Sequence, residues 1–502
     1  MGCSTTNEEP KFKRSNRRRV TQSKNKDIRK NYEFISMLGN GSFGKVRLYR
    51  DRNYKDLLFA IKTLKKEGIP QYQFNLLKSE VDILSNLDHP NIVKYFGTFE
   101  DEFFIHIVME YLKGHDLDRI ISLKNYTGLD EKNMCQIIQQ LLKALAFIHS
   151  KNIIHRDIKP ENILFSNKRN YSSLRLIDFG LATFEKQDNK SVGTPFYMSP
   201  ETIDGNSTPL SDIWSVGVIV YQMITGKLPF EANDKDNQTL YNKIKNDDYD
   251  RDILNEIDCS EEVKDFIYKT LQKEPTMRLN TQDSLNHPWI LKFCVKNNDT
   301  DLISDETVEI LLDFAKKNIL QKEIYYFIAK VSNENDIDNY KTFFNQLDSH
   351  NTGSLSYEDL KEGFESKNIE IIDVLDEIFN GLNYHKSGKI NYSEFLSAMV
   401  SSKNYPKEEK LISVFNLLNE SEVNKNYITY ESLMNAVKAL NLNINEGEIK
   451  KCFQHYDNEI SFEEFKKLIL NDDIDKKSYA EDMRHLNKDL KYKRSLARHK
   501  TH

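Results

Sequence analysis

The spacing of apolar positions divides the chain into a region of short strands and a longer region of helices. From Tyr32 on, short apolar runs such as residues 46–49 and 58–61 alternate with glycine-containing turns, which predicts a small β-rich lobe. After about residue 130, apolar residues recur at three- and four-residue spacing, which predicts a larger helical lobe. The recurring positions are Met134, Ile137, Ile138, Leu141, Leu142 and Leu145.

A second helical region follows the apolar run at 287–290. Residues 305–330 have the pattern of one amphipathic helix, and beyond 338 a unit of helix, polar loop, short apolar strand and helix repeats about four times. Both ends of the chain are polar and basic, and the first lacks apolar periodicity, so we expect it to be disordered. The predicted parts are an arm at 1–31, a two-lobed domain at 32–290, a junction at 291–337, the repeats at 338–472 and a tail at 473–502.

The bulk composition limits the possible classes of protein but does not indicate a function. A chain of 502 residues is long enough for two to four domains, and its net charge of −6 favours no particular partner. No apolar run is long enough to cross a bilayer, and the first thirty residues lack the apolar core of a secretory signal. The five cysteines form no CxxC pair, so we expect neither a zinc site nor a disulfide framework, and a reducing compartment fits.

A glycine-rich segment lies early in the β-rich lobe. A GxGxxG pattern alone also occurs in dinucleotide-binding turns, but here strands are predicted on both sides, so the glycines would form a hairpin that folds over phosphates. Further on, Lys62 lies late on a predicted strand, where it can reach phosphates if a carboxylate such as Glu80 holds it. The segment reads Leu38, Gly39, Asn40, Gly41, Ser42, Phe43, Gly44, Lys45 and Val46.

Three more motifs follow in a fixed order. They are His155-Arg156-Asp157 with Asn162, then Asp178-Phe179-Gly180, then Ser199-Pro200-Glu201. Together with the glycine loop and Lys62, the set resembles the protein kinase family over residues 32–290. The resemblance implies a two-lobed fold, with ATP and Mg²⁺ as cofactors and protein as the substrate.

The resemblance also implies roles at the matched positions. Asp157 corresponds to the base that accepts the substrate hydroxyl proton, and Lys159 to the residue that steadies the transferring phosphoryl group. Asn162 and Asp178 correspond to the magnesium ligands, since their oxygens are hard donors. For adenine, the family positions that enclose the ring or offer backbone groups are Val46, Ala60, Leu164, Glu110 and Leu112.

Two features favour a serine/threonine kinase over a tyrosine kinase. Lys159 is the residue typical of that class in the catalytic loop, and Gly193-Thr194-Pro195 precedes the SPE motif. Asp212 and Arg278 match positions that brace the catalytic loop and pair with Glu201.

The alternative is a kinase fold retained as a scaffold. Such proteins usually lose the strand lysine or an aspartate, and here Lys62, Asp157, Asn162 and Asp178 are all present; Ser199 in place of alanine is a minor departure.

The activation segment runs from Asp178 to Glu201, and its sequence does not decide which negative group would pair with Arg156. Arg156 needs a negative partner there, and Lys190 cannot provide it. Phosphorylation of Ser191 or Thr183, or the carboxylate of Glu185, could serve instead.

Substrate preference rests on two acids. Asp116 and Glu161 match positions at which kinases hold arginines upstream of the target serine, although exposed acids are often no more than solvated surface charges.

The repeats have the rhythm of EF-hands. The first loop spans 348–359 with Gly353 at its turn, and the second spans 383–394 with Gly388 in register. With the kinase motifs and the junction, the chain resembles the calcium-dependent protein kinases of plants and protists over nearly its whole length. The fold class is therefore α+β, a two-lobed kinase followed by an all-α EF-hand domain with partly degenerate loops. In that family the junction helix blocks the kinase until calcium binds.

The ligand chemistry of the loops is incomplete. The first loop has His350 at position 3 and the short Asp359 at position 12, and the second has His385 and a single carboxylate. A third loop, at 419–432, and a fourth, from Asp457 to Glu464, have irregular lengths. Two alternatives remain: weak calcium binding that still switches the kinase, or packed helical pairs that bind a partner. The candidate calcium ligands are Asp348, Thr352, Ser354, Asp359, Asn383 and Glu394.

The N-terminal arm suggests attachment to a membrane. Gly2 fits the myristoylation pattern, Cys3 could be palmitoylated, and the basic residues from Lys11 to Arg19 could face anionic lipid. We therefore expect the protein to lie at the cytoplasmic face of a membrane, with a cytosolic pool; a cytosolic arm with import-like basic residues is the alternative.

Aromatic residues are not interleaved with the basic ones, so we expect no binding to nucleic acid. We also expect a monomer. The tail is interpreted as solvated.

Overall fold

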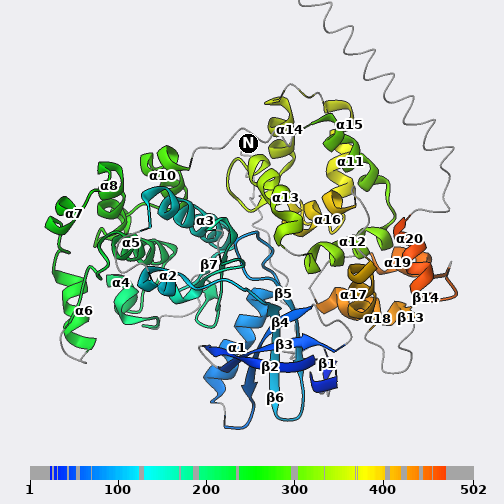
Figure 1. Cartoon of the computed structure of the whole chain (residues 1–502), viewed down its shortest axis with the longest axis horizontal. Helices are drawn as coiled ribbons and strands as arrows, with labels where there is room; N and C mark the ends of the chain where they lie inside the picture. The colour runs from blue at the N-terminus through cyan, green and yellow to red at the C-terminus, as the bar shows by residue number, and fades with distance from the viewer. Residues whose placement is uncertain are drawn as a thin grey trace, which may run out of the picture. The chain divides into compact units, whose positions relative to one another are not determined.

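The chain folds into two compact units (Figure 1). One comprises most of residues 1–295 and the other most of 296–502. Within the described residues no helix combines the length and the apolar character needed to cross a bilayer. The computed structural model describes residues 23–24, 28–30, 32–41, 44–52, 57–68, 70–123, 129–168, 171–184, 191–232, 237–294, 304–332, 334–367, 369, 371–401, 408–419, 427–439, 445–454 and 456–470.

A six-stranded sheet forms the first lobe of the first unit. Its strand order is β1-β5-β6-β4-β3-β2, with β1 parallel to β5 and the other neighbours antiparallel. Apolar residues on one face, including Phe59, Ile61 and Val108, make a buried cluster. On β4, Lys62 alternates with these residues and therefore points to the opposite face. The elements are β1 (Ser23–Lys24), β2 (Tyr32–Gly41), β3 (Gly44–Asp51), β4 (Leu58–Lys65), α1 (Gln71–Leu84), β5 (Tyr95–Glu100) and β6 (Phe104–Glu110).

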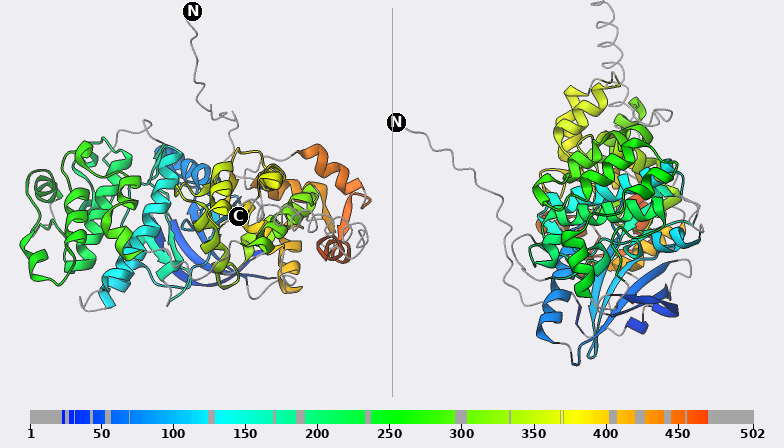
Figure 2. Two further views of the ribbon diagram at one scale, coloured as in Figure 1. Left: turned by 90° about the horizontal axis from the view of Figure 1, so that it is seen from above. Right: turned by 90° about the vertical axis from the view of Figure 1, so that its left-hand side faces the viewer.

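Helices make up most of the second lobe (Figure 1 and Figure 2). The predicted helix after residue 130 is α3, whose N-terminus is capped by Asp130. A Cβ on Gly217 of α5 would lie 2.5 Å from Oγ1 of Thr270, so glycine allows α5 and α8 to pack closely. The helices are α2 (Leu117–Leu123), α3 (Glu131–Ser150), α4 (Pro200–Ile203), α5 (Pro209–Thr225), α6 (Asn237–Asn246), α7 (Asp252–Glu256), α8 (Glu261–Thr270), α9 (Thr281–Leu285) and α10 (Pro288–Phe293).

Two short antiparallel strand pairs carry the loops of this lobe. β7 (Ile153–Ile154) pairs with β10 (Thr183–Phe184), and β8 (Ile163–Phe165) pairs with β9 (Leu174–Leu176). Their ends present the two segments that contain the predicted catalytic motifs. Single 3₁₀ turns lie at Ile28–Lys30, Pro160–Asn162, Tyr171–Ser173, Pro195–Tyr197 and Pro275–Met277.

The second unit is helical and contains the four predicted repeats as two pairs. Each pair is joined by a short antiparallel ladder, β11 with β12 and β13 with β14. The α+β class and the all-α second domain are thus confirmed. The elements are α13 (Glu334–Leu347), β11 (Ser354–Leu355), α14 (Tyr357–Glu365), α15 (Ile372–Leu382), β12 (Ile390–Asn391), α16 (Tyr392–Val400), α17 (Glu408–Leu418), β13 (Tyr427–Thr429), α18 (Tyr430–Ala439), α19 (Glu446–Gln454), β14 (Glu459–Ser461) and α20 (Phe462–Leu470).

The junction differs from the prediction of one continuous helix. It contains α11 (Asp305–Lys316) and α12 (Ile319–Val331), because Asn318 forms a capping box with Gln321 and restarts the helix. Both helices belong to the second unit. α11 lies directly on α15, since a Cβ on Gly381 would fall 2.3 Å from Cβ of Ala315.

Candidate active site

A buried lysine joins the sheet to the motifs of the second lobe. Nζ of Lys62 lies 2.6 Å from Oε1 of Glu80 on α1 and 3.0 Å from Oδ1 of Asp178. The predicted ion pair is therefore formed. Burial alone would lower the pKa of Lys62, but the two carboxylates outweigh it and raise that pKa above its usual value. Asp178 keeps 14% of its side chain exposed, whereas Glu80 keeps 1%.

Backbone strain is stored at two motif residues. Arg156 and Asp178 adopt φ values of 66° and 56°, which non-glycine residues rarely do. Asp212 holds the first of these turns, because its carboxylate accepts from the backbone N–H groups of His155 at 3.0 Å and Arg156 at 2.9 Å. Burial would raise the pKa of Asp212, yet the bonds from His149 and His155 lower it. The predicted bracing role of Asp212 is confirmed.

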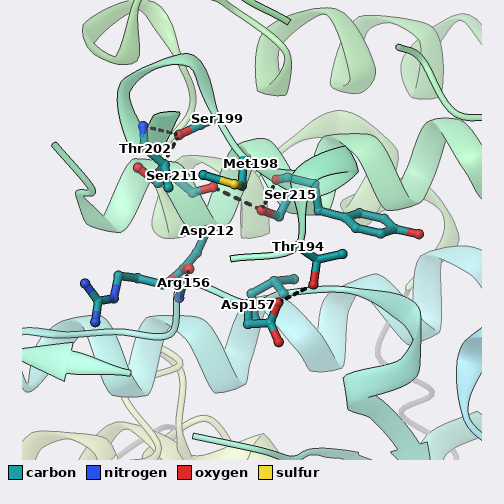
Figure 3. Close-up of a pocket in the computed structure, with 11 residues that line it drawn as sticks. Arg156, Asp157, Thr194, Met198, Ser199, Thr202, Ser211, Asp212 and Ser215 are labelled. Atoms are coloured by element: carbon teal, nitrogen blue, oxygen red, sulfur yellow. Dashed lines mark hydrogen bonds between the residues drawn. The ribbon is translucent and has the colours of Figure 1, made fainter. Parts of the chain in front are cut away.

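Asp157 lies in a polar cluster beside a pocket (Figure 3). Oδ1 of Asp157 accepts from Oγ1 of Thr194 at 2.6 Å; the two side chains, which both line the pocket, point toward each other. Nζ of Lys159 lies 2.9 Å from Oδ2 of Asp157 and donates to Thr194 at 2.8 Å. Asn162 donates to the carbonyl and to Oδ2 of Asp157. Thr194 thus fixes both candidate catalytic residues, although the sequence used it only as a sign of serine/threonine specificity.

The glycine hairpin is formed by β2 and β3. Asn40 pairs with Lys45 and Gly41 with Gly44 across the turn. A Cβ on Gly44 would lie 2.5 Å from the carbonyl oxygen of Thr63, so a side chain there would push the hairpin off β4. Leu38 is largely exposed. Ser42 and Phe43 at the tip lie outside the described residues.

The predicted adenine wall is assembled from three strands. Val46 lies opposite Lys62 in the ladder of β3 and β4, so Val46, Ala60 and Lys62 share one face of the sheet. Leu164 lies on β8, half-buried. These positions agree with an apolar wall beside the phosphate-binding lysine.

At the hinge after β6, Glu110 can offer adenine only one of its two backbone polar groups. The amide of Glu110 already donates to the carbonyl of Lys94 at 3.0 Å, so only its carbonyl is left for an adenine ring. Its side chain is held by Arg175 at 3.1 Å. Leu112 is buried at the end of the hinge.

ATP and Mg²⁺ fit this donor set. Asp178 and Asn162 supply carboxylate and amide oxygens of the kind that Mg²⁺ prefers, and the partly exposed carboxylate of Asp178 is accessible to an ion. Lys62 is charged and held in place beside it. The residues would therefore hold a metal–nucleotide complex.

A second ion pair supports the segment after the pocket. Arg278 makes two bonds to Glu201, of 2.8 Å and 3.2 Å, as the sequence predicted. Burial would raise the pKa of Glu201, but Arg278 lowers it. Such a two-pronged pair fixes orientation as well as charge.

The activation segment is described only in part. Nε of Arg156 donates to the carbonyl of Leu181 at 2.7 Å. Thr183 lies on β10 and Ser191 is described, whereas Glu185 and Lys190 lie outside the described residues. The choice of a negative partner for Arg156 stays a prediction.

Acidic side chains gather near the pocket. Asp116 caps α2 through the amide of Arg119, at 2.7 Å. Burial and then the charge of Asp118 raise the pKa of Glu161, and burial and then Asp116 raise that of Asp118. Asp118 therefore adds to the negative field that the sequence assigned to Asp116 and Glu161 alone.

The first EF-hand loop keeps its turn. The carboxylate of Asp348 accepts from the amides of Thr352 and Gly353, both at 2.8 Å, and Gly353 has a φ of 71°. Oγ1 of Thr352 donates to the carbonyl of Ser354. At position 12, Asp359 accepts from the amide and hydroxyl of Ser356.

The second loop has the same outline. Oδ1 of Asn383 accepts from the amide of Ser387 at 3.0 Å, and Oε2 of Glu394 accepts from the amide of Asn391 at 2.7 Å. Oε1 of Glu394 lies 2.9 Å from Nδ1 of His385. Both candidate ligands therefore already have partners within the chain.

All four loops end in the same type of capping hydrogen bond. The residue at position 12 bonds back to the amide three residues before it and so caps the exiting helix. A retained acid at this position thus has a structural role apart from calcium. Within the described residues, no three His, Cys, Asp or Glu side chains are arranged to hold a metal ion. The capping pairs are Ser356 with Asp359, Asn391 with Glu394, Thr429 with Ser432 and Ser461 with Glu464.

Comparison with known proteins agrees with both units. Residues 32–290 match the protein kinase domain family and residues 337–400 the EF-hand domain pair. Calcium-dependent protein kinase 7 of Arabidopsis thaliana is 31% identical over 454 residues, which are 88% of this chain and 82% of that protein. Calcium-dependent protein kinase 3 of Plasmodium berghei (strain Anka) is 31% identical over 447 residues, 85% and 78%. Calcium-dependent protein kinase 4 of Plasmodium falciparum (isolate 3D7) is 29% identical over 471 residues, 89% and 88%.

Proposed function

The chain belongs to the calcium-dependent protein kinase family, and on that basis we propose that calcium controls its activity through the EF-hand unit and that acylation tethers it to a membrane. The catalytic activity itself is that of a protein serine/threonine kinase with ATP and Mg²⁺ as cofactors. One observation carries the assignment of the active site: Lys62 is held by Glu80 and Asp178 at the same time, so the phosphate-binding and metal-binding groups are already aligned.

The catalytic roles follow from this geometry. Asp157 accepts the proton of the substrate hydroxyl while that oxygen attacks the γ-phosphorus, and Thr194 keeps the carboxylate oriented. Lys159 offsets the charge that spreads over the transferring phosphoryl group. Lys62 positions the inner phosphates. Asn162 and Asp178 would hold magnesium, which would offset negative charge on the phosphates.

A peptide phosphorylation assay tests these roles. The full chain is assayed with a serine peptide, ATP and Mg²⁺ in parallel with Asp157→Asn. We expect the substitution to lower kcat by about 10²–10⁴-fold with a smaller change in KM, because it removes the proton acceptor and preserves the shape. Asp204→Asn is the matched control, since Asp204 is exposed and pairs only at the surface with Lys245. Equal rates for wild type and Asp157→Asn would reject the assigned role.

Calcium control is proposed from the EF-hand pair and the family. The first loop supports it best, because Asp348 and Gly353 keep the turn and Asp359 lies at position 12. The same assay is run with calcium and with a chelator. We expect a higher rate with calcium, and an unchanged rate would reject calcium control while leaving the kinase activity intact.

Membrane attachment is proposed from the N-terminal sequence. Gly2, Cys3 and the basic residues after them lie outside the described residues, so the support is the pattern alone. We expect the protein at the cytoplasmic face of a membrane with a cytosolic pool. Metabolic labelling with a myristate analogue should mark the wild type but not Gly2→Ala, and equal labelling would contradict the proposal.

Substrate preference is proposed from the acidic group at the pocket. Burial and then the charge of Asp118 raise the pKa of Glu161, and burial and then the charge of Asp116 raise the pKa of Asp118, which supports a negative field at this place. A basic residue upstream of the target serine would relieve that repulsion. Asp118→Asn together with Glu161→Gln should raise KM for a basic peptide and leave KM for a neutral peptide unchanged; equal effects on both would contradict this preference.

A further inference from the structure

The second EF-hand loop contains a buried histidine at position 3, where the fold would place a calcium ligand. His385 has 3% of its surface exposed. Its ring lies between Glu394, at position 12 of the same loop, and Glu323 of α12. Both carboxylates have no exposed surface. A side chain thus occupies the centre of the loop and connects it to the junction.

Both ring nitrogens of His385 lie beside a carboxylate. Nε2 is 2.9 Å from Oε1 of Glu323, with which it forms a hydrogen bond. Nδ1 is 2.9 Å from Oε1 of Glu394. The ring therefore bridges α12 and the position-12 acid of the second loop.

Aromatic rings enclose the imidazole. Tyr326 of α12 meets it edge to face with ring centroids 5.3 Å apart, and Tyr384 lies at 4.3 Å. The contacts of His385 with Glu323 and Glu394 are therefore shielded from solvent, and the low dielectric of such a site strengthens them.

Calcium does not fit beside this ring. An EF-hand needs both oxygens of the position-12 carboxylate, and here Oε1 of Glu394 lies 2.9 Å from Nδ1 of His385 and also accepts from the amide of that residue. A divalent ion at the loop centre would have to expel the buried ring, which would leave Glu323 buried without its partner.

The first loop has the same histidine in a different setting. His350 also contacts the position-12 acid, with Nδ1 3.0 Å from Oδ1 of Asp359, but 64% of its side chain is exposed. No carboxylate from another helix is recorded on its second nitrogen within the described residues. His350 can therefore turn into solvent at little cost and release Asp359 to a metal ion.

We propose that the imidazole of His385 occupies the second loop in place of calcium and fastens α12 to that loop, so that any calcium response of the pair is confined to the first loop. The second half of this statement rests on the proposed calcium control, and the first half does not. The consequence is a junction helix that stays attached to this loop at every calcium concentration.

Hydrogen exchange of the full chain in chelator tests the attachment. We expect His385→Asn to accelerate amide exchange in residues 319–331 by about tenfold or more, because two buried carboxylates lose their contact with the ring. His350→Asn is the matched control and should leave this exchange as in wild type. Adding Glu323→Gln to His385→Asn should slow the exchange again, since one of the stranded charges is gone. Exchange that is unchanged in His385→Asn, or equally raised in both histidine variants, would overturn the proposal.

Calcium stoichiometry tests the loop assignment. Calorimetric titration of the full chain with CaCl₂ should show the same number of bound ions for Glu394→Gln as for wild type, and one fewer for Asp348→Asn. Loss of an ion in Glu394→Gln would overturn the assignment. If the wild type binds no calcium, calcium control and the role of the first loop both fail, while the exchange experiment still decides whether His385 fastens α12.

Discussion

The catalytic cleft and the second EF-hand loop both contain one basic side chain between two carboxylates, and the two arrangements differ in exposure. In the cleft, Lys62 lies between Glu80 and Asp178, and Asp178 keeps 14% of its side chain exposed. In the loop, His385 lies between Glu323 and Glu394, and both are fully buried.

This difference separates a binding site from a structural ion pair. The cleft has one carboxylate turned toward the ligand space, so a metal ion can be added without removing the lysine. In the loop, Oε1 of Glu323 and Oε1 of Glu394 both face His385, and an added ion must displace that ring. The sequence motifs identify acidic residues in both places, but the exposure of each side chain decides whether it can bind a metal ion.

The largest effect should come from removing the cation in the cleft. Lys62→Met should lower kcat/KM by roughly a hundred- to a thousandfold, because the inner phosphates lose their charged partner. It should also cost about 3 kcal/mol of stability, since Glu80 is left buried without a counter-charge. Peptide phosphorylation and urea unfolding measure the two losses separately.

The double variant Lys62→Met, Glu80→Gln distinguishes the two. We expect it to recover most of the unfolding free energy and none of the activity. If stability returned together with activity, the role of Lys62 would be structural, and the cleft would not differ from the loop in the way described above.

A smaller effect is expected at the glycine hairpin. Gly44→Ala places a Cβ 2.5 Å from the carbonyl oxygen of Thr63, so the hairpin must shift by an amount that costs about 1–3 kcal/mol. KM for ATP should rise by about tenfold, as measured by initial rates against ATP concentration. Gly39→Ala is the matched control, because nothing lies within 4 Å of its added Cβ. An equal rise in both variants would show that chain stiffness, and not the close approach to β4, is what matters.

The two loops of the EF-hand pair should respond differently to the same kind of improvement. Asp359→Glu adds the methylene group that position 12 lacks and can still cap α14, so the calcium affinity of the full chain should rise by about tenfold. Asn383→Asp adds a carboxylate to the second loop and should change calcium affinity little, because His385 still occupies it. Calorimetry measures both. A larger gain from Asn383→Asp would place calcium in the second loop.

The kinase half was predictable because its chemistry lies in contiguous motifs. The order of Lys62, Asp157, Asn162 and Asp178 was enough to predict which residues come together, and the ion pair with Glu80 followed from one predicted helix. Thr194 was underestimated, because its bonds to Asp157 and Lys159 join segments that are distant in the sequence.

The EF-hand half was less predictable for a physical reason. The sequence shows His385 in a loop with a single carboxylate, but its partner Glu323 lies 62 residues earlier on α12 and belongs to no motif. The break at Asn318 was also missed, because the apolar pattern of residues 305–330 continues through it while a local capping box ends the helix. Long-range ion pairs and caps of this kind become visible only when the helices are placed.

The smallest effect tests whether the acids at position 12 are structural. Glu464 in the fourth loop bonds to the amide and hydroxyl of Ser461 at 2.8 Å and 2.6 Å, which caps α20. Glu464→Ala should therefore lower the unfolding free energy of the second unit by about 1 kcal/mol in chelator, as measured by urea unfolding. Glu463→Ala, at an exposed neighbouring position of the same helix, should change it by less than about 0.5 kcal/mol. If Glu464→Ala lost stability only when calcium is present, the acid would be a ligand, and the fourth loop would resemble the cleft more than the second loop does.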